Sequence, residues 1–429
     1  MRVIEGLDKA RSAMTRHVIR DGGEEQERSV RQILRDVRER GDAAVREYTA
    51  KYDGVRLASF EVDKAEIDRA YRELDKELSA ALKLSAERIA AYHAAQKRGL
   101  VRDSVNKKLG WVMRPLEKIG IYAPGFQAPL PSSVLMTAVP ARIAGVKEII
   151  MATPPDRQGK IAPVVLAAAA IAGIDRVFSL GGAQAIAALA WGTESIPKVQ
   201  KIYGPGNIWV TLAKKMVYGE AGIDGLYGPS EVVIIADDTA TPAYCAADLL
   251  AQAEHGSGPT AILITTSSRM AKLVNEEIEK QMEPLPRREI IKRSLESQGL
   301  IAIVKSVEEA IELANFYAPE HLCLVVANAK SYVEKVKNAG CLFLGENSIE
   351  ALVDYTAGPS HVLPTEGTAR FGSGLSILDF VKLISVVRLD KKDILELGRA
   401  TALFARAEGL DAHARAVEKR LESMGRGGH

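Results

Sequence analysis

The chain has 429 residues, of which 47% are hydrophobic and 26% are charged, and its net charge at pH 7 is +2. This length predicts more than one domain, and the composition is that of an ordinary globular protein. Because the net charge is so small, there is no electrostatic reason to expect nucleic acid or a membrane surface as a partner. The three cysteines have no CxxC spacing, which argues against a disulfide framework.

The apolar segments are short. The most apolar stretch, residues 162–174, is rich in Ala and too short to span a bilayer, so it predicts a buried helix. The first five residues show neither an apolar signal segment nor the Arg- and Ser-rich character of a transit peptide. We therefore expect a cytoplasmic protein.

Residues 1 to about 110 are rich in charge, with apolar residues every three or four positions over residues 29–51 and 64–97. This periodicity predicts helices, and no catalytic motif accompanies it. From residue 118 onward, short apolar runs alternate with helical patterns. The expected strands cover residues 118–122, 148–152, 176–180, 199–203, 232–236, 261–265, 301–305, 322–327 and 341–345. Alternation in two consecutive blocks predicts two similar parallel sheets covered by helices.

Two Gly-rich turns follow strands of the first block and open helices, Gly181-Gly182-Ala183-Gln184 and Gly204-Pro205-Gly206-Asn207. Such turns favour a phosphate or nucleotide at the helix N-termini. There is no GxGxxG with an acidic residue about twenty positions later, so the usual dinucleotide fingerprint is absent. On spacing alone, tight structural turns explain these segments at least as well as a cofactor site does.

The four residues Ala318-Pro319-Glu320-His321 join a helical pattern, residues 307–317, to an apolar run of strand length. Because Pro319 cannot continue a helix, the helix is expected to end near residue 317. A carboxylate and an imidazole then lie side by side at a helix-to-strand corner, which suits a site that moves protons. A surface Glu beside a partly buried His is the alternative that the pair alone leaves open.

Candidate metal ligands lie in three further segments. Gln252 and His255 are three residues apart near a helix end, so both would lie on one helix face, and Asp354 lies in a Gly/Pro loop with His361. Glu408 and His413 lie in the C-terminal tail. Imidazoles and carboxylates without thiolates suit zinc. Spacing alone does not show that these segments meet, and a polar helix face is the alternative for the first pair.

Several blocks of sequence identify a family. They are Tyr122-Ala-Pro-Gly125, Gly181-Gly-Ala-Gln184, Gly204-Pro-Gly-Asn207, Gly228-Pro-Ser-Glu231, Gln252-Ala-Glu-His255, Ala318-Pro-Glu-His321, Asp354-Tyr355 with His361-Val-Leu-Pro364, Arg370-Phe-Gly-Ser-Gly-Leu375 and Glu408-Gly-Leu-Asp-Ala-His413. In this order, and over nearly the whole chain, they resemble the histidinol dehydrogenase family. The resemblance implies oxidation of L-histidinol to L-histidine in two NAD-dependent steps, through an aldehyde that stays bound.

The resemblance also implies roles for single residues. His321 would be the base that takes the alcohol proton, and Glu320 would activate water to hydrate the aldehyde. One Zn2+ per subunit would be held by Gln252, His255, Asp354 and His413, which with His321 also belong to the substrate site. Ser230, His361 and Glu408 would contact the substrate. Tyr122, Gln184 and Asn207 would contact NAD, and the preference for NAD over NADP rests on the resemblance.

The fold implied is α/β, with two similar incomplete Rossmann-like parallel-sheet domains in an intertwined homodimer. Residues 1–20 would be an N-terminal helical arm, and residues 21–117 with 231–378 a first α/β domain carrying most of the zinc and catalytic site. Residues 118–230 would bind NAD. Residues 379–429 would be a helical tail on the partner subunit, so that Glu408 and His413 cross the interface. The amphipathic pattern from residue 383 onward agrees, because it has little core of its own.

The chain departs from the family pattern at Phe126, Gly256, Val353 and the pair Leu226-Tyr227. None of these removes a proposed ligand or catalytic group, but they bear on loop geometry and on substrate fit. One alternative is therefore a related zinc- and NAD-dependent enzyme that oxidises another small polar alcohol. Another is a binding or regulatory protein that keeps the fold without turnover, against which the intact set of acid, base and ligands argues.

Overall fold

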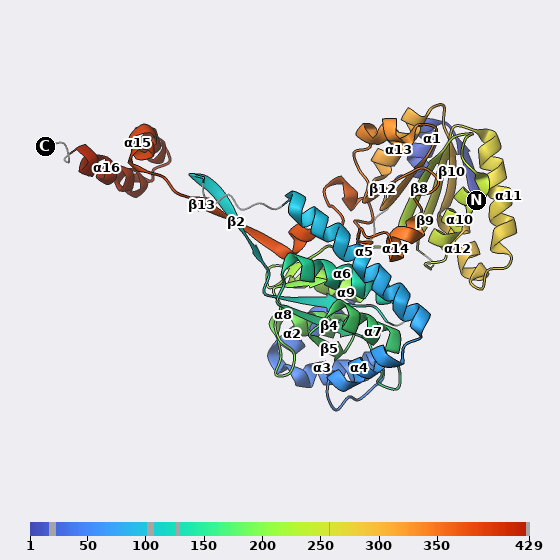
Figure 1. Cartoon of the computed structure of the whole chain (residues 1–429), viewed down its shortest axis with the longest axis horizontal. Coiled ribbons are helices and arrows are strands. Elements are labelled where there is room, and N and C mark those ends of the chain that lie inside the picture. The colour runs from blue at the N-terminus through green and yellow to red at the C-terminus, as the bar shows by residue number, and fades with distance from the viewer. Residues whose placement is uncertain (17–22, 101–106, 126–128, 257, 426–429) are drawn as a thin grey trace. The chain divides into compact units, whose positions relative to one another are not determined.

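The structure is a computed structural model, and it describes residues 1–16, 23–100, 107–125, 129–256 and 258–425. The chain divides into two compact units (Figure 1). Unit 1 consists of Met1–Lys97 and Leu116–Phe380, and unit 2 of Arg98–Pro115 and Val381–His429. None of the helices in the described part of the chain combines the length and hydrophobicity that crossing a bilayer requires.

Unit 1 contains two parallel sheets. Sheet A has the strand order β1-β10-β9-β8-β11-β12, and all of its neighbouring strands run parallel. Its strands are β1 (Arg2–Glu5), β8 (Glu231–Ala236), β9 (Thr260–Thr265), β10 (Gly299–Ile303), β11 (His321–Val325) and β12 (Cys341–Leu344). Every residue of β8 and β11 is buried, as expected for central strands covered on both faces.

Sheet B has the strand order β5-β4-β3-β6-β7 and is also parallel throughout. Its strands are β3 (Lys118–Tyr122), β4 (Glu148–Thr153), β5 (Arg176–Ser179), β6 (Lys201–Tyr203) and β7 (Gly222–Ile223). Without the edge strand β1, the two sheets share one topology: in each, the third, second, first, fourth and fifth strands along the chain are neighbours in that order. This is the order of an incomplete Rossmann fold, so the predicted α/β class with two similar sheets is confirmed.

Helices cover both faces of sheet A. Alternate residues of β8 point to opposite faces, so that Val232 and Ile234 belong to one hydrophobic core and Val233 and Ile235 to the other. The helices that supply these two cores are α10 (Pro242–Ala253), α11 (Ser268–Met282) and α12 (Arg288–Gln298) for the first, and α1 (Leu7–Ala13) and α13 (Val307–Tyr317) for the second.

The helical N-terminal part of unit 1 completes the core of sheet B. The helices α2 (Glu24–Arg40), α3 (Asp42–Tyr48), α8 (Gly182–Trp191) and α9 (Ile208–Val217) share one core with strands of this sheet. The other helical elements of unit 1 are η1 (Thr49–Asp53), α4 (Lys64–Glu73), α5 (Lys76–Leu100, whose last three residues belong to unit 2), α6 (Pro131–Ala144), α7 (Pro163–Ala172), η2 (Ala329–Lys335), α14 (Glu350–Tyr355), η3 (Thr368–Arg370) and η4 (Ile377–Phe380). The helices predicted over residues 29–51 and 64–97 are confirmed.

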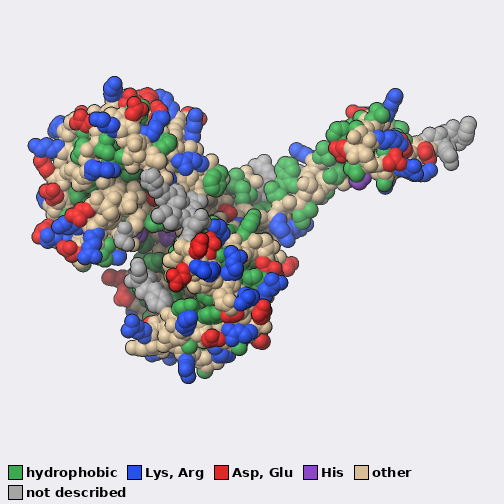
Figure 2. Space-filling view, turned by 180° about the vertical axis from the view of Figure 1, so that it is seen from behind, with side chains coloured by type: hydrophobic (Ala, Val, Ile, Leu, Met, Phe, Trp, Pro, Cys, Tyr) green, Lys and Arg blue, Asp and Glu red, His purple; other side chains and the backbone are tan. Residues whose placement is uncertain are grey.

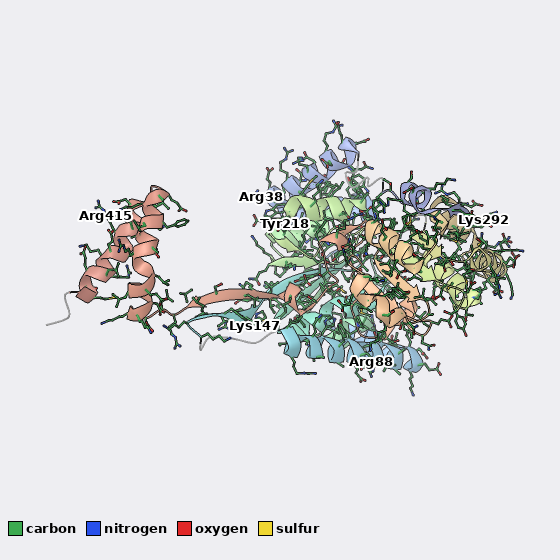
Figure 3. All side chains as sticks on the ribbon, turned by 90° about the horizontal axis from the view of Figure 1, so that it is seen from above. Arg38, Arg88, Lys147, Tyr218, Lys292 and Arg415 are labelled. Atoms are coloured by element: carbon green, nitrogen blue, oxygen red, sulfur yellow. The ribbon has the colours of Figure 1, made fainter. Side chains whose placement is uncertain are left out.

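Unit 2 is a small unit with little core. Its strands β2 (Leu109–Pro115) and β13 (Val381–Val387) pair antiparallel, and its helices α15 (Lys391–Ala407) and α16 (Asp411–Gly425) pack on each other. Asp390 caps α15 in a capping box. The core between the two helices is made of small residues, Ala402, Ala405 and Ala414. Side chains project from both helices, and Arg415, on α16, is labelled in Figure 3.

Two predictions of local structure are wrong. Residues 2–5 form strand β1 rather than part of a helical arm, because they pair with β10 about 300 residues away. Residues 383–387 belong to strand β13 rather than to an amphipathic helix, because β2 supplies a partner strand. Helix α6 begins at Pro131 and has no side-chain cap. Phe126 lies outside the described residues.

Candidate active site

Helix α13 ends at Tyr317, as predicted from Pro319. Ala318 closes the helix with a φ of 54°, in the left-handed region, and its N–H donates to the carbonyl of Ala314. Three residues later the chain enters β11 at His321, so that Glu320 directly precedes this strand and His321 begins it. Both side chains are buried, with 5% of Glu320 and 3% of His321 exposed, which rules out a surface Glu at this corner.

The strand next to β11 holds both side chains. The backbone N–H of Glu231, at the start of β8, donates to Oε2 of Glu320 at 2.9 Å, and its carbonyl oxygen lies 3.2 Å from Nδ1 of His321. A carbonyl can only accept, so Nδ1 must carry the proton and donate. The other ring nitrogen, Nε2, is then an acceptor, and it is buried without a partner among the described residues. His321 is therefore set up as a base at Nε2.

Glu350 is a functional candidate that no sequence pattern predicts. It lies at the start of α14 and is buried, and its Oε1 is 3.4 Å from Nδ1 of His321. Oε2 of Glu320 lies 3.8 Å from the same nitrogen. The imidazole is thus flanked by two carboxyl groups, which can stabilise it when it gains a proton. No motif marks Glu350, and its burial by tertiary packing gives no signal in the sequence.

These groups line a cavity of about 180 Å³. Its polar lining residues include Ser132, Ser133, Tyr227, Ser230, His255, Glu320, His321, Glu350, Asp354, His361 and Thr365. Most of the predicted substrate residues of unit 1 are therefore brought together. Within the cavity, Nε2 of His361 lies 3.5 Å from Oγ of Ser133, and its Nδ1 lies 3.1 Å from the carbonyl oxygen of Asp354.

Burial controls the charges in this cavity. It lowers the pKa of His321 to about 3 and that of His361 to about 4, so both imidazoles are neutral at pH 7. Burial raises the pKa of Asp354 to about 6 and the pKa of Glu320 and Glu350 well above their usual range. Among the described residues that line the cavity there is no Lys or Arg. The carboxyl groups therefore lack a protein cation, and a bound divalent ion would supply one.

The amide of Gln252 gives a second sign of an absent group. Its side chain is fully buried in α10, and neither Oε1 nor Nε2 has a hydrogen-bond partner among the described residues. Leaving such a group unpaired costs about 1–3 kcal/mol, so a ligand is expected there. His255 and Asp354 line the cavity. Burial raises the pKa of Asp354, and the nearby His255 acts to lower it. An amide, an imidazole and a carboxylate are suitable zinc ligands.

The remaining predicted zinc ligand and the remaining predicted substrate residue lie on unit 2. His413, in α16, and Glu408, which ends α15, are both exposed. Within the described ranges, no three His, Cys, Asp or Glu side chains are grouped as a complete metal site requires. Two predicted positions are wrong. Asp354 lies on helix α14 rather than in a loop, and α10 ends at Ala253, so that His255 follows the helix.

The predicted cofactor residues lie at the carboxyl edge of sheet B. Tyr122 ends β3, and its hydroxyl accepts a hydrogen bond from the N–H of Gly182 at 3.2 Å. Nε2 of Gln184, in the first turn of α8, donates to Oδ2 of the buried Asp53 at 3.3 Å. Burial raises the pKa of Asp53 to about 6. These contacts hold the first Gly-rich turn next to the end of β3.

The second Gly-rich turn is held by a buried ion pair. Nζ of Lys214 lies 2.5 Å from Oδ1 of Asp224 and donates to the carbonyl of Gly204 at 2.8 Å. Oδ2 of Asp224 accepts from the N–H of Gly204 at 2.7 Å. Asn207 caps α9, and its Oδ1 accepts from the N–H groups of Trp209 and Val210. The two turns follow strands β5 and β6, so they lie at the carboxyl edge of an incomplete Rossmann sheet. This is the edge at which such folds bind ligands.

Comparison with known proteins agrees with this arrangement. The family model of histidinol dehydrogenase matches residues 19–421. The chain belongs to the histidinol dehydrogenase family. It is 52% identical to a histidinol dehydrogenase of Dehalococcoides mccartyi over 98% of this chain and 100% of that protein, and 50% identical to one of Bacillus cereus over 92% of each chain. A crystal structure of histidinol dehydrogenase from Elizabethkingia anophelis has a TM-score of 0.95 at 38% identity, covering 99% of each chain.

Membership of the histidinol dehydrogenase family makes the protein an oxidoreductase of histidine biosynthesis. The structure explains some of its departures from the family pattern. Gly256 has a φ of 146°, which side chains rarely adopt, and Val353 packs against one core of sheet A. Tyr227 lines the cavity, and its hydroxyl is hydrogen-bonded to Asp224, the residue that holds the second Gly-rich turn. Nothing in the structure explains Leu226.

Proposed function

We propose that the protein oxidises L-histidinol to L-histidine through bound L-histidinaldehyde, with zinc and two molecules of NAD. The observation that carries this proposal is the pair of backbone bonds from Glu231, which orients Glu320 and leaves Nε2 of His321 as an unpaired acceptor in a buried cavity. A base and a water activator side by side are what oxidation of an alcohol to an acid requires.

In the first oxidation, Nε2 of His321 removes the hydroxyl proton of the alcohol as a hydride leaves the adjacent carbon. The low pKa of His321 keeps its imidazole neutral before the reaction, so no proton has to be lost first. The carboxyl groups of Glu320 and Glu350, when ionised, then favour the imidazolium by opposite charge. NAD, when bound, accepts one hydride in each oxidation.

In the second oxidation, water first adds to the aldehyde carbon. The Glu320 carboxylate takes a proton from this water while the His321 imidazolium formed in the first oxidation gives its proton to the aldehyde oxygen. A C–O bond forms to the water oxygen, the carbonyl π bond breaks, and the aldehyde becomes a hydrate with His321 neutral again. His321 removes a proton from the hydrate as the second hydride leaves, which gives the carboxylic acid. Because Glu320 is buried next to His321, the two groups can act in turn on one substrate that has not left the site.

Zinc would be held by Gln252, His255, Asp354 and His413. The unpaired amide of Gln252 and the uncompensated carboxyl groups of the cavity support this assignment. When bound, zinc supplies a fixed positive charge that binds the imidazole and amino nitrogens of histidinol and orients the alcohol. Ser230 and His361 line the same cavity, where they would contact the substrate together with Glu408.

NAD would lie along the two Gly-rich turns of sheet B, in contact with Tyr122, Gln184 and Asn207. The N-termini of α8 and α9 lie at these two turns, and the positive ends of their helix dipoles suit a pyrophosphate. The hydrogen bonds of Asp53 and of the Lys214–Asp224 pair would keep both turns in place. Domain 118–230 is therefore the part of the chain that we assign to the cofactor.

The functional form would be a cytoplasmic homodimer in which unit 2 packs on the partner subunit. Unit 2 exposes many large apolar side chains for its small size, and Figure 2 shows hydrophobic side chains on its surface. They are Leu100, Leu109, Trp111, Leu383, Ile384, Val387, Leu389, Leu395, Leu397, Leu403, Phe404 and Leu410. So large an exposed apolar surface marks an interaction site. Glu408 and His413 would then complete the site of the partner subunit.

The test is an assay of histidinol-dependent NADH formation by the purified protein, before and after chelation and after zinc is added back. We expect two NADH per histidinol, loss of activity on chelation and recovery with zinc. Reduction of NAD by another small alcohol but not by histidinol would instead show a related alcohol dehydrogenase. Zinc content near zero in protein that still binds NAD would show a binding protein.

A further inference from the structure

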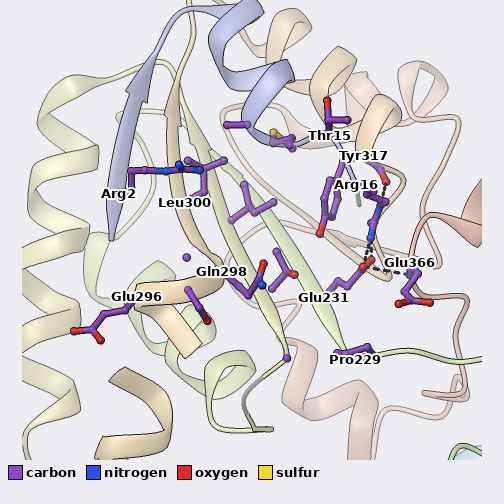
Figure 4. Close-up of a pocket in the computed structure, with 17 residues that line it drawn as sticks. Arg2, Thr15, Arg16, Pro229, Glu231, Glu296, Gln298, Leu300, Tyr317 and Glu366 are labelled. Atoms are coloured by element: carbon purple, nitrogen blue, oxygen red, sulfur yellow. Dashed lines mark hydrogen bonds and ion pairs between the residues drawn. The ribbon is translucent and has the colours of Figure 1, made fainter. Parts of the chain in front are cut away.

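Arg16 and Glu231 form an ion pair on the far side of the strand that holds the active site. The Arg16 guanidinium donates to both carboxylate oxygens of Glu231, one of them, from Nη2, at 2.7 Å. Its Nε donates to the carbonyl of Tyr317 at 3.0 Å, and its centre lies 3.7 Å from the centroid of the Tyr317 ring. The N–H of Glu366 also donates to Glu231. Figure 4 shows this group of side chains.

This ion pair is largely removed from water. Only 4% of the Glu231 side chain and 13% of the Arg16 side chain are exposed. Burial raises the pKa of Glu231, and the hydrogen bond and charge of Arg16 act in the opposite direction. Removing one partner of a buried pair leaves an uncompensated charge, which would rearrange or draw in water. The Glu231 side chain is therefore held in place by Arg16.

Glu231 connects this pair to the catalytic groups. Its side chain faces a cavity of about 440 Å³ that Arg16 and Tyr317 also line. Its backbone N–H binds the Glu320 carboxylate, and its carbonyl binds Nδ1 of His321. Tyr317 is also the last residue of α13, three positions before Glu320. Arg16 thus contacts both chain segments that determine where the catalytic pair lies.

We propose that Arg16 and Glu231 are positioning residues for the reaction: the buried ion pair keeps the Glu231 backbone aligned with Glu320 and with Nδ1 of His321. This inference rests on the proposed function, since it concerns the same two groups. Arg16 and Glu231 both line the larger cavity. Neither of them lines the smaller cavity, where the substrate and zinc residues lie. Their loss should therefore lower kcat much more than it raises KM.

The large cavity allows a direct test by chemical rescue. In Arg16→Ala, the space of the lost guanidinium opens into the 440 Å³ cavity, which is large enough to admit a free guanidinium ion. We expect kcat for histidinol oxidation to fall roughly tenfold to a hundredfold, as for a small misplacement of reacting groups. Guanidinium at millimolar concentration, far below denaturing levels, should restore much of the lost kcat in a saturable way. Ammonium and urea at the same concentrations should not.

Arg11 provides the matched control. It lies on α1, pairs with Glu312 and stands over the Phe316 ring at 5.6 Å, so it repeats the Arg16 arrangement at an exposed place. Its side chain is 40% exposed, and exposed pairs contribute little. Arg11→Ala should keep the kcat of the unaltered protein and should not respond to guanidinium.

The outcomes separate this inference from the proposed function. Absence of histidinol oxidation by the unaltered protein defeats the proposed function. An active unaltered protein with unchanged kcat in folded Arg16→Ala, or a loss that guanidinium does not reverse, defeats the positioning role. If Arg16→Ala does not fold, Arg16→Lys decides, because an ammonium keeps the charge but cannot donate to both oxygens in a fork. Its kcat should fall at unchanged KM and zinc content, and an unchanged kcat would overturn the inference.

Discussion

Oε2 of Glu320 accepts a hydrogen bond of 2.9 Å from the backbone N–H of Glu231. An amide oxygen can accept this bond as well as a carboxylate oxygen does. The contact therefore fixes the position of the side chain without depending on its charge. Position and basicity of Glu320 can be separated by experiment for this reason.

Glu320→Gln should keep the side chain in place and remove its ability to take a proton from water. We expect conversion of histidinaldehyde to histidine to slow by roughly a hundredfold or more, the range for loss of a general base. Oxidation of histidinol to the aldehyde, which uses His321, should change much less. Both half-reactions can be followed separately by NADH formation from each substrate. Equal losses in the two would refute the role of Glu320 in activating water, and Glu308→Gln, exposed on α13, is the control.

Gly204 should be required for cofactor binding. Its φ is 111°, and a Cβ at this position would lie 2.1 Å from the carbonyl oxygen of Tyr122. Gly204→Ala should therefore displace the second Gly-rich turn and raise the KM for NAD by roughly tenfold or more. Gly219 has a φ of 106° with no described atom within 4 Å of its Cβ position, so Gly219→Ala carries the backbone strain without the clash. A similar NAD affinity in the two variants would contradict the assignment of this turn.

Asp53 should make the protein more stable as the pH falls from 7.5 to 5.5. Burial raises its pKa to about 6 in the folded chain, whereas the ordinary value is 3.8. Over this range the folded state takes up a proton that the unfolded state does not, so this group favours folding at the lower pH. Between pH 7.5 and pH 5.5 this group should add about 1 kcal/mol to the free energy of unfolding. In Asp53→Asn this part of the pH dependence should be missing from urea unfolding at the two pH values. An identical pH dependence in both proteins would exclude the shifted pKa.

Sequence patterns predict the parts of the fold that depend on local periodicity. The helix that ends at Tyr317 and the strand that follows it were predictable, because Pro319 ends a helix regardless of its surroundings. Strands β1 and β13 were not, because each forms only by pairing with a segment about 270 to 300 residues away. Periodicity over a short window cannot contain that information.

The residues of the candidate site likewise fall into those that sequence motifs predict and those that they do not. The adjacent Glu320 and His321 and the Gly-rich turns are visible as motifs, because their chemistry depends on residues next to each other. Glu350 and the pair of Arg16 with Glu231 are not, since their roles come from burial and from contacts between distant segments. The backbone groups of Glu231 carry no side-chain signal at all, and only the register of β8 against β11 brings them to the catalytic residues.

His413 should complete the site of the partner subunit, and mixed dimers test this most directly. His413→Asn alone should lower zinc affinity, measured as zinc content after dialysis, whereas Arg415→Gln, on the same helix and exposed, should not. Homodimers of Glu320→Gln and of His413→Asn should both be nearly inactive in the complete reaction. The two variants can be produced together with different affinity tags, and the mixed dimer isolated.

If His413 acts across the interface, one of the two sites in the mixed dimer contains an intact Glu320 from one chain and an intact His413 from the other. The mixed dimer should then recover about half the activity of the unaltered dimer. If His413 acts within its own chain, each of the two sites retains one defect and activity stays at the level of the homodimeric variants. The exposure of His413 and of the large apolar side chains of unit 2 favours the first result.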